Sequence, residues 1–335
     1  MSKIRMLARI LPLACTLALP GAAAAVDSTE AVAVVATIKP VHSIAAAVMA
    51  GVGVPDLLVP GSASPHTFAL KPSAARAVHR ARLFVRIGPE VEPFTERLVA
   101  SLPADVAIVT LTETPGLRLL PLREGAGFEP HVHGTGHGSA GHTDARTTHD
   151  GHGHAEDGRI DGHIWLDPDN ARAMARHLAG VLARIYPDKA SVFDANVARF
   201  EAEVEAASSE IDSALAPIRG RPFITFHDAY HYFEHRFGLS ALGSLSLSPE
   251  IPTGARRISA VRATISRLGE VCVFGEPQHG ASLLKAVVSG TPARLGSLDP
   301  IGGDIPQGAQ HYVRMLRGVA AGLSGCLGSL KGKAG

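Results

Sequence analysis

Residues 189–215 read KASVFDANVARFEAEVEAASSEIDSAL, and their pattern decides the architecture that we expect for the whole chain. Apolar side chains recur every three or four residues, with Glu and Asp between them, at Phe193, Val197, Phe200, Val204, Ala207, Ile211 and Leu215. This is the period of one face of an α-helix. The stretch therefore predicts one uninterrupted helix of roughly seven turns, ended by Pro217 and Gly220.

The segments on both sides of this helix alternate short β-branched runs with amphipathic stretches. Before it come VAVVATI, FVRI and AIVTL, and after it come FITF, VCVFGE and ARLGSL. Such alternation is typical of parallel sheets covered by helices. We therefore predict an α/β protein with two lobes, each a parallel sheet flanked by helices, joined by one long rigid helix. The expected ranges are 26–187 for the N-terminal lobe, 188–217 for the connecting helix and 218–335 for the C-terminal lobe.

Residues 1–25 place three basic side chains ahead of an apolar stretch, 10–19, and a run of alanines. This is the pattern of a signal peptide cleaved near Ala25, and it is too short for a permanent membrane helix. A lipoprotein signal at Cys15 is the alternative, although Pro12 fits that motif poorly. We expect a periplasmic protein, secreted through this cleaved signal.

The charge of the chain argues against nucleic acid as a partner. Loss of the three basic residues of the signal peptide, which holds no acidic residue, changes the formal charge from +1 to −2. A near-neutral exported chain has no electrostatic attraction to a phosphate backbone.

Two of the three cysteines, Cys272 and Cys326, follow the signal peptide. An even pair in an oxidising compartment predicts a disulfide bond. A thiolate metal site is the alternative, but the two residues are far apart and no C-x-x-C motif occurs.

Residues 131–163 read HVHGTGHGSAGHTDARTTHDGHGHAEDGRIDGH and hold eight of the 17 histidines. So few apolar residues cannot form a core, and we expect a mobile loop inserted at 131–162. Its composition is typical of metal binding, and imidazole suits zinc, copper and nickel. A solvated linker is the alternative. The predicted accessory ligands are His131, His133, His137, His142, His149, His152 and His154.

Three further histidines, His66, His163 and His227, each lie at or just after the end of a predicted strand. Open α/β sheets bind their ligands at this edge, so the three side chains could meet in a cleft between the lobes. Taken singly, each could instead be a hydrogen-bonded structural residue. His279 shows no ligand spacing and Glu276 no evident partner, so neither is assigned to a site.

Several motifs in the same order carry a resemblance to a known family. They are VVATIKPVHSIAAAVMAGV, VPGSASPHTFALKPSAARAV, HIWLDPDNARAMA, FHDAYHYFEHRFGL, VFGEPQ and SLDPIGG. The chain resembles the ABC-transporter substrate-binding proteins that collect zinc or manganese, and most closely the zinc-specific members of the ZnuA type.

The resemblance implies that His66, His163 and His227 bind the metal. The fourth ligand varies in the family between an aspartate in the LDP motif, a glutamate before the first histidine, and water. Pro65 stands at the glutamate position here, so Asp299 is the expected fourth ligand. Three imidazoles with at most one carboxylate favour Zn²⁺ over manganese.

The expected function is the high-affinity zinc-binding component of an ABC-type uptake system. It captures Zn²⁺ in the periplasm and delivers it to a membrane permease, as a monomer and not an enzyme, with a periplasmic zinc chaperone as a further partner. A manganese-binding homologue is one alternative. An exported zinc hydrolase is another, but neither H-E-x-x-H nor G-x-S-x-G occurs. An adhesin or storage protein would fit the export and the histidines without explaining the motifs.

Overall fold

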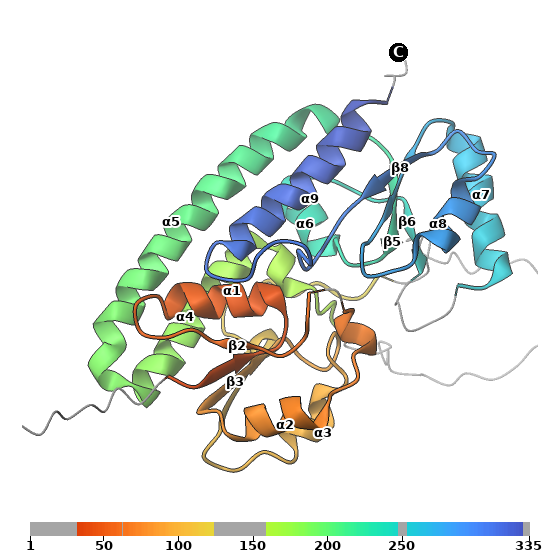
Figure 1. Ribbon diagram of the computed structural model, residues 1–335. Helices are drawn as coiled ribbons and strands as arrows, with labels where there is room; N and C mark the ends of the chain where they lie inside the picture. The colour runs from red at the N-terminus through yellow and green to blue at the C-terminus, as the bar shows by residue number, and fades with distance from the viewer. Residues whose placement is uncertain (1–31, 62, 124–158, 247–252, 331–335) are drawn as a thin grey trace, which may run out of the picture. The chain divides into compact units, whose positions relative to one another are not determined.

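The computed structural model describes residues 32–61, 63–123, 159–246 and 253–330, all within one compact unit (Figure 1). The predicted signal peptide and the seven accessory histidines between 131 and 154 lie outside these residues. In the described part of the chain, no helix has the length and apolar content needed to cross a membrane.

The first sheet has four parallel strands in the order β2-β1-β3-β4. This half of the chain contains β1 (Val34–Ala36), α1 (Lys39–Val48), β2 (Asp56–Leu57), α2 (Pro72–His79), β3 (Leu83–Arg86), α3 (Thr95–Val99) and β4 (Ala107–Thr110). Successive strand residues face opposite sides of a sheet. Val34 and Leu83 therefore pack into the main core with α1, whereas Val35 and Phe84 pack against Val78 of α2. Both faces are covered, as a parallel sheet requires.

The second sheet repeats this order as β6-β5-β7-β8. This half contains β5 (Phe223–His227), α6 (His231–Phe237), β6 (Gly243–Ser246), α7 (Ala255–Leu268), β7 (Cys272–Gly275), α8 (Ala281–Val288), β8 (Arg294–Ser297) and α9 (His311–Gly328). Phe223 and Phe274 face the main core, while Ile224 and Val273 pack against Ile265 of α7. The two parallel sheets flanked by helices confirm the predicted fold class.

Helices α4 (Pro168–Ile185) and α5 (Ala190–Leu215) lie between the two sheets in the sequence. The 26 residues of α5 form one helix, and all seven apolar positions that predicted it are buried. The described residues also form short 3₁₀ turns at Pro65–Thr67, Leu111–Glu113, Ile164–Leu166, Pro187–Lys189 and Ala216–Ile218.

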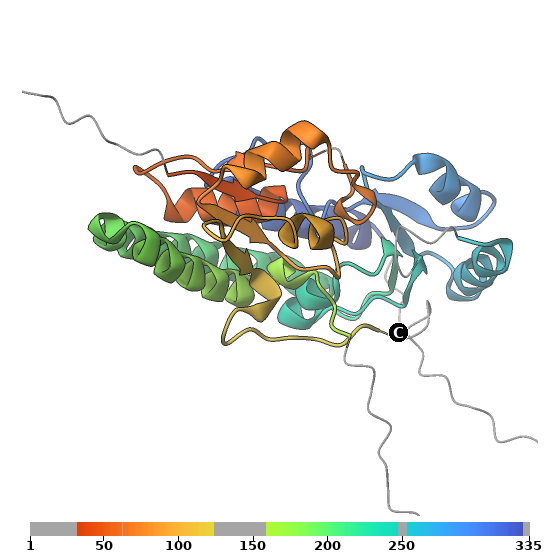
Figure 2. The same cartoon turned by 90° about the horizontal axis from the view of Figure 1, so that it is seen from below.

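Helix α5 contacts elements from both halves of the chain, and Figures 1 and 2 show it running along α4 and α9. Near its start, the Asn196 amide donates to the carbonyl oxygens of Val48 and Ala50 at 2.8 Å each. Near its end, Glu210 accepts from Arg317 of α9 at 2.8 Å. The long helix thus connects α1 of the first half with α9 of the second, in agreement with the connector expected from the sequence.

A disulfide bond joins Cys272 of β7 to Cys326 of α9, which confirms the predicted pair. Its Cα atoms lie 6.2 Å apart, and 54 positions separate the two residues in the chain. The bond fastens the C-terminal helix to a central strand of the second sheet.

Removal of this bond should lower the free energy of unfolding. For the variant Cys272→Ala/Cys326→Ala we expect a loss of about 4 kcal/mol, because a crosslink across 54 positions restricts the unfolded chain. Urea denaturation followed by circular dichroism measures the change. A reducing agent should destabilise the wild type and leave the variant unaffected, and equal urea midpoints for the two proteins would contradict the prediction.

Candidate metal centre

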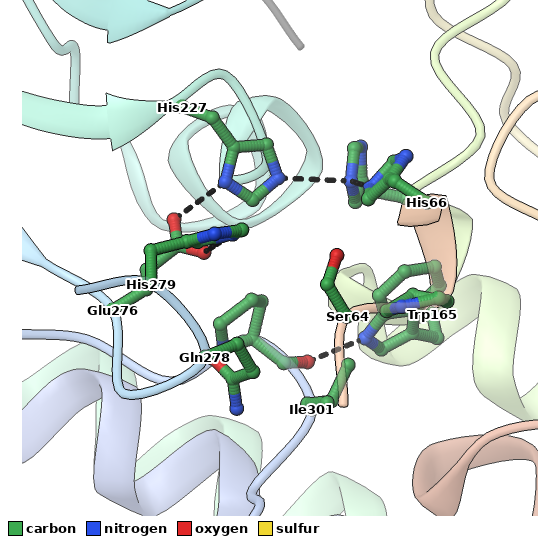
Figure 3. A pocket seen from close by; sticks show the side chains of 11 residues that line it. Ser64, His66, Trp165, His227, Glu276, Gln278, His279 and Ile301 are labelled. Atoms are coloured by element: carbon green, nitrogen blue, oxygen red, sulfur yellow. Dashed lines mark hydrogen bonds and ion pairs between the residues drawn. The ribbon is translucent and has the colours of Figure 1, made fainter. Parts of the chain in front are cut away.

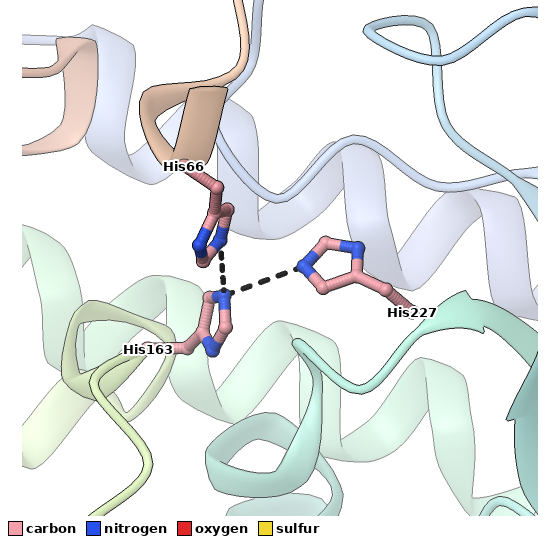
Figure 4. A group of neighbouring side chains, drawn as sticks. All are labelled: His66, His163 and His227. Atoms are coloured by element: carbon pink, nitrogen blue, oxygen red, sulfur yellow. Dashed lines mark hydrogen bonds between the residues drawn. The ribbon is translucent and has the colours of Figure 1, made fainter. Parts of the chain in front are cut away.

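Three histidine side chains from distant parts of the sequence converge at one point (Figure 4). His66 lies in the 3₁₀ turn Pro65–Thr67, His163 directly precedes the turn Ile164–Leu166, and His227 is the last residue of β5. The Nε2 atom of His163 lies 3.2 Å from that of His66 and 3.3 Å from that of His227. The structure therefore brings together the three histidines singled out in the sequence.

The spacing of these nitrogens fits a tetrahedral metal ion. Zinc–nitrogen bonds of about 2.0–2.1 Å place two ligand nitrogens of a tetrahedron about 3.3–3.4 Å apart. All three Nε2 atoms point inward, and the side chains of His163 and His227 are only 9% and 3% exposed. The arrangement is that of a buried three-imidazole metal site.

Two carboxylates hold the outer nitrogens of the imidazole rings. His163 Nδ1 donates to Asp161 Oδ1 at 2.7 Å, and His227 Nδ1 lies 2.7 Å from Glu276 Oε1. A carboxylate at Nδ1 keeps the proton there and leaves the Nε2 lone pair for a metal. Sequence reasoning missed both carboxylates. Glu276 ends the predicted strand VCVFGE and directly follows β7, so the strand-end signal that identified His227 could have found it.

The carboxylates near the buried histidines favour a positive charge at this site. Burial opposes a proton on His163, but Asp161, Asp228 and Glu276 together raise its pKa above the usual value. Burial raises the pKa of Glu276 to about 8, although His279, His163 and His66 oppose this rise. A divalent cation bound to the imidazoles would supply the missing charge.

The cavity beside the histidines is small (Figure 3). Its volume is about 10 Å³, and Ser64, Pro65, His66, His163, Trp165, His227, Glu276, Gln278, His279, Pro300 and Ile301 line it. A cavity of this size admits about one water molecule or one ion, whereas pockets for organic ligands measure hundreds of cubic ångströms. The volume of the cavity therefore fits an ion rather than an organic ligand.

The structure does not bring Asp299, the expected fourth ligand, into the histidine group. Asp299 Oδ1 accepts from the backbone N–H groups of Ile301 and Gly302, at 3.1 and 2.9 Å, and from the Gln278 amide at 2.9 Å. Its Oδ2 accepts from the Gly303 N–H at 2.6 Å. The carboxylate closes the turn that carries Pro300 and Ile301 to the cavity wall. Three of the four donors bind Oδ1 and one binds Oδ2, so the carboxylate is held in the turn by hydrogen bonds.

A second group of potential ligands adjoins the first. Among the described residues, His227, Glu276 and His279 form the other set of three whose ligand atoms lie within 4.8 Å of one another. His279 also lines the cavity, a position that its sequence spacing did not indicate.

The two ends of the histidine-rich segment are joined close to the metal centre. Leu122 N donates to Arg159 O at 3.2 Å, and Asp161 N donates to Leu120 O at 2.9 Å. The Tyr232 hydroxyl donates to Asp161 O at 2.8 Å and accepts from the N–H of Leu120 at 3.0 Å. Asp161 therefore belongs both to this stem and to the site, through His163.

Arg123, at the stem, bridges two buried carboxylates. Its guanidinium donates to Asp228, the residue after His227, and to Glu234 of α6 at 2.9 Å. Glu234 also accepts from the backbone N–H of Ala241 at 2.8 Å. These bonds fix the stem to the strand end that carries His227.

Comparison with known proteins agrees with the resemblance seen in the motifs. The family model "Zinc-uptake complex component A periplasmic" matches residues 34–326. The chain is 40% identical over 304 residues to the high-affinity zinc uptake system protein ZnuA of Brucella abortus (strain 2308), covering 88% of this chain and 91% of that protein.

Two solved structures share the fold. A crystal structure of ZnuA has a TM-score of 0.70 at 23% identity, covering 89% of this chain and 99% of that one. The laminin-binding protein Lmb of Streptococcus agalactiae, described as an adhesin with metal-transporting activity, has a TM-score of 0.69 at 20% identity, with coverages of 88% and 99%.

The variant Asp299→Asn tests which of its two possible roles this residue has. An asparagine NH₂ cannot accept from the Gly303 N–H, so we expect the metal-free protein to lose about 1–3 kcal/mol of unfolding free energy. Zinc affinity, measured against a competing fluorescent chelator, should fall by less than about tenfold, below the usual loss of even an indirect partner.

The exposed neighbour provides the matched control for this substitution, since Asp304→Asn changes the same chemical group in the same loop. A ligand role for Asp299 would give the opposite result, namely unchanged stability without metal and a larger loss of zinc affinity.

Proposed function

The chain belongs to the family of periplasmic A components of zinc-uptake complexes, and on that premise we propose that it is the high-affinity zinc-binding component of an ABC-type uptake system. It captures Zn²⁺ in the periplasm and delivers it to a membrane permease. The observation that carries this proposal is the convergence of three Nε2 atoms beside a cavity with room for one ion, with that of His163 at 3.2 Å from His66 and 3.3 Å from His227.

The donor set supports zinc rather than manganese. His66, His163 and His227 offer three neutral nitrogens, whereas manganese prefers oxygen ligands. The carboxylates of Asp161 and Glu276 face the Nδ1 atoms of the rings. A water molecule in the fourth position would complete the tetrahedron, since Asp299 does not belong to the group of potential ligands that the three histidines form.

A zinc hydrolase fits these observations less well. Catalytic zinc needs a substrate beside its water and a general base within reach. The cavity beside the three histidines, about 10 Å³, holds little more than an ion, and the neighbouring pocket of about 500 Å³ is lined by Glu276 and His279 but by none of the three histidines. A different zinc-enzyme motif, H-x-x-E-H, does occur at 231–235. However, Glu234 is bound by Arg123 and His235 is exposed. Neither residue belongs to a group of metal ligands among the described residues.

The histidine-rich segment would act as a collector. Many weak sites close to a tight one raise the local zinc concentration around it. The described stem supports this role, because Asp161 binds both Leu120 of the stem and the imidazole of His163. Export through the signal peptide, docking of the zinc-loaded protein on the permease and transfer from a periplasmic chaperone complete the proposed pathway.

Removal of one ligand should abolish tight binding. We expect His66→Ala to weaken zinc binding by at least about 100-fold, since the loss of even an indirect partner of a ligand costs 10–100-fold. Calorimetric titration of the mature protein with Zn²⁺ measures this loss. His235→Ala removes an exposed imidazole from α6 and should keep the wild-type affinity. Equal affinities in the two variants would refute the three-histidine site.

Deletion of residues 131–157 should separate the collector from the tight site. We expect the shortened protein to retain one tight zinc site and to lose only weaker ones, because His66, His163 and His227 lie outside the deleted range. A full-length variant with serine at the seven accessory positions controls for the change in chain length. Loss of the tight site in both variants would mean that the segment supplies direct ligands.

A further inference from the structure

We propose that Glu276 and His279 form a second, weaker cation position at the mouth of the cavity, through which Zn²⁺ passes on its way to and from the three histidines. This inference rests on the proposed function. It assigns a role to His279, which the three-histidine site does not use.

The distances allow one cation to bind both residues. Glu276 Oε2 lies 3.7 Å from His279 Nε2, while Glu276 Oε1 lies 2.7 Å from His227 Nδ1. Two donor atoms separated by 3.7 Å can share an ion, because zinc bonds to nitrogen and oxygen measure about 2.0–2.2 Å each. Glu276 therefore offers one oxygen to the ring that orients the tight site and the other to the second position.

The exposure of the side chains indicates which of them an incoming ion meets first. The side chain of His279 is 16% exposed, whereas those of His163 and His227 are 9% and 3% exposed and His66 as a residue is 9% exposed. Figure 3 shows His279 and Glu276 on one side of the cavity and His66 on the other. An incoming ion would therefore reach His279 before it reaches the three histidines.

The ring of His279 is held in position. It stacks on Phe226, with ring centroids 4.6 Å apart and an interplanar angle of 14°. Its backbone N–H donates to Glu276 O at 3.1 Å, in the turn after β7. Phe226 is the neighbour of His227 in β5, so the second position is attached to the same strand end as the tight site.

Such a position would act on rates rather than on affinity. A hydrated cation must exchange its waters for imidazoles, and a carboxylate with one imidazole replaces part of the hydration shell before the buried ligands replace the rest. Two protein ligands bind less tightly than three, so the ion moves on to the histidines. A group that lowers only the barrier between the free and bound states accelerates loading and release equally.

The single tryptophan provides the measurement. Trp165 lies beside the tight site, with its ring centroid 5.3 Å from that of His163, and it is the only tryptophan of the chain. Stopped-flow fluorescence of the full mature protein mixed with Zn²⁺ therefore reports arrival at the three histidines, while zinc held by the accessory histidines contributes no signal. Mixing the loaded protein with a chromophoric chelator gives the release rate independently.

The informative variant is His279→Phe, which preserves an aromatic ring on Phe226 and removes the nitrogen. We expect loading and release both to slow by about tenfold, equivalent to about 1.4 kcal/mol on each barrier, while the calorimetric affinity stays within about threefold of the wild type. His279→Gln should slow both steps as well, and His235→Phe on α6 is the matched control that should change neither.

Three results would overturn the inference. Unchanged rates in His279→Phe, in a protein whose thermal unfolding matches the wild type, would remove His279 from the path of the ion. Faster release with unchanged loading would make His279 a ligand of the bound state instead. Absence of tight zinc binding by the wild type in calorimetry would refute the proposed function itself, and the second position with it.

Discussion

The Nε2 atoms of His66 and His227, held 3.2 and 3.3 Å from that of His163, constrain the surrounding structure, because their lone pairs repel one another unless a proton or a metal cation lies between them. The rings must be kept together by bonds made elsewhere. Asp161 and Glu276 provide these bonds at the Nδ1 atoms of His163 and His227. Each carboxylate comes from a backbone segment that is itself fixed, one in the stem of the histidine-rich segment and the other after a central strand.

Contacts between the two halves of the chain also hold the three histidines together. The Trp165 indole donates to Pro300 O at 2.7 Å, and the Tyr312 hydroxyl donates to Trp165 O at 2.8 Å. The Lys39 ammonium donates to the carbonyl oxygens of Gly303 and Ile305. Together with α5, which contacts both α1 and α9, these bonds favour a preformed site over one assembled by a large hinge motion.

The parts that could be predicted from the sequence depend on local periodicity or on strand ends. The seven apolar positions of 189–215 determine one face of a helix whatever surrounds it, and His227 is found because it ends a buried strand. Asp161, two residues before His163, and Glu276, at the end of a predicted strand, were also within reach of such local signals. The place of His279 at the cavity depends on how the loops after β5 and β7 meet, and no spacing within one segment records this. Asp299 was assigned from its motif alone, and its role in the turn becomes visible only with the backbone N–H groups of Ile301, Gly302 and Gly303 in place.

The position of the two carboxylates behind the imidazole rings allows the site both to bind Zn²⁺ tightly and to release it. Neutral imidazoles leave the two positive charges of Zn²⁺ uncompensated, and a carboxylate bound directly to the ion would offset part of that charge while adding a strong bond that delivery must break. In this structure the carboxylates of Asp161 and Glu276 lie behind the rings, one imidazole away from the ion position. They attract a cation held by the three histidines without bonding to it there. A carrier that must surrender its ion to a permease gains from this arrangement, because the bonds to be exchanged are three neutral ones and the site remains ordered after the ion leaves.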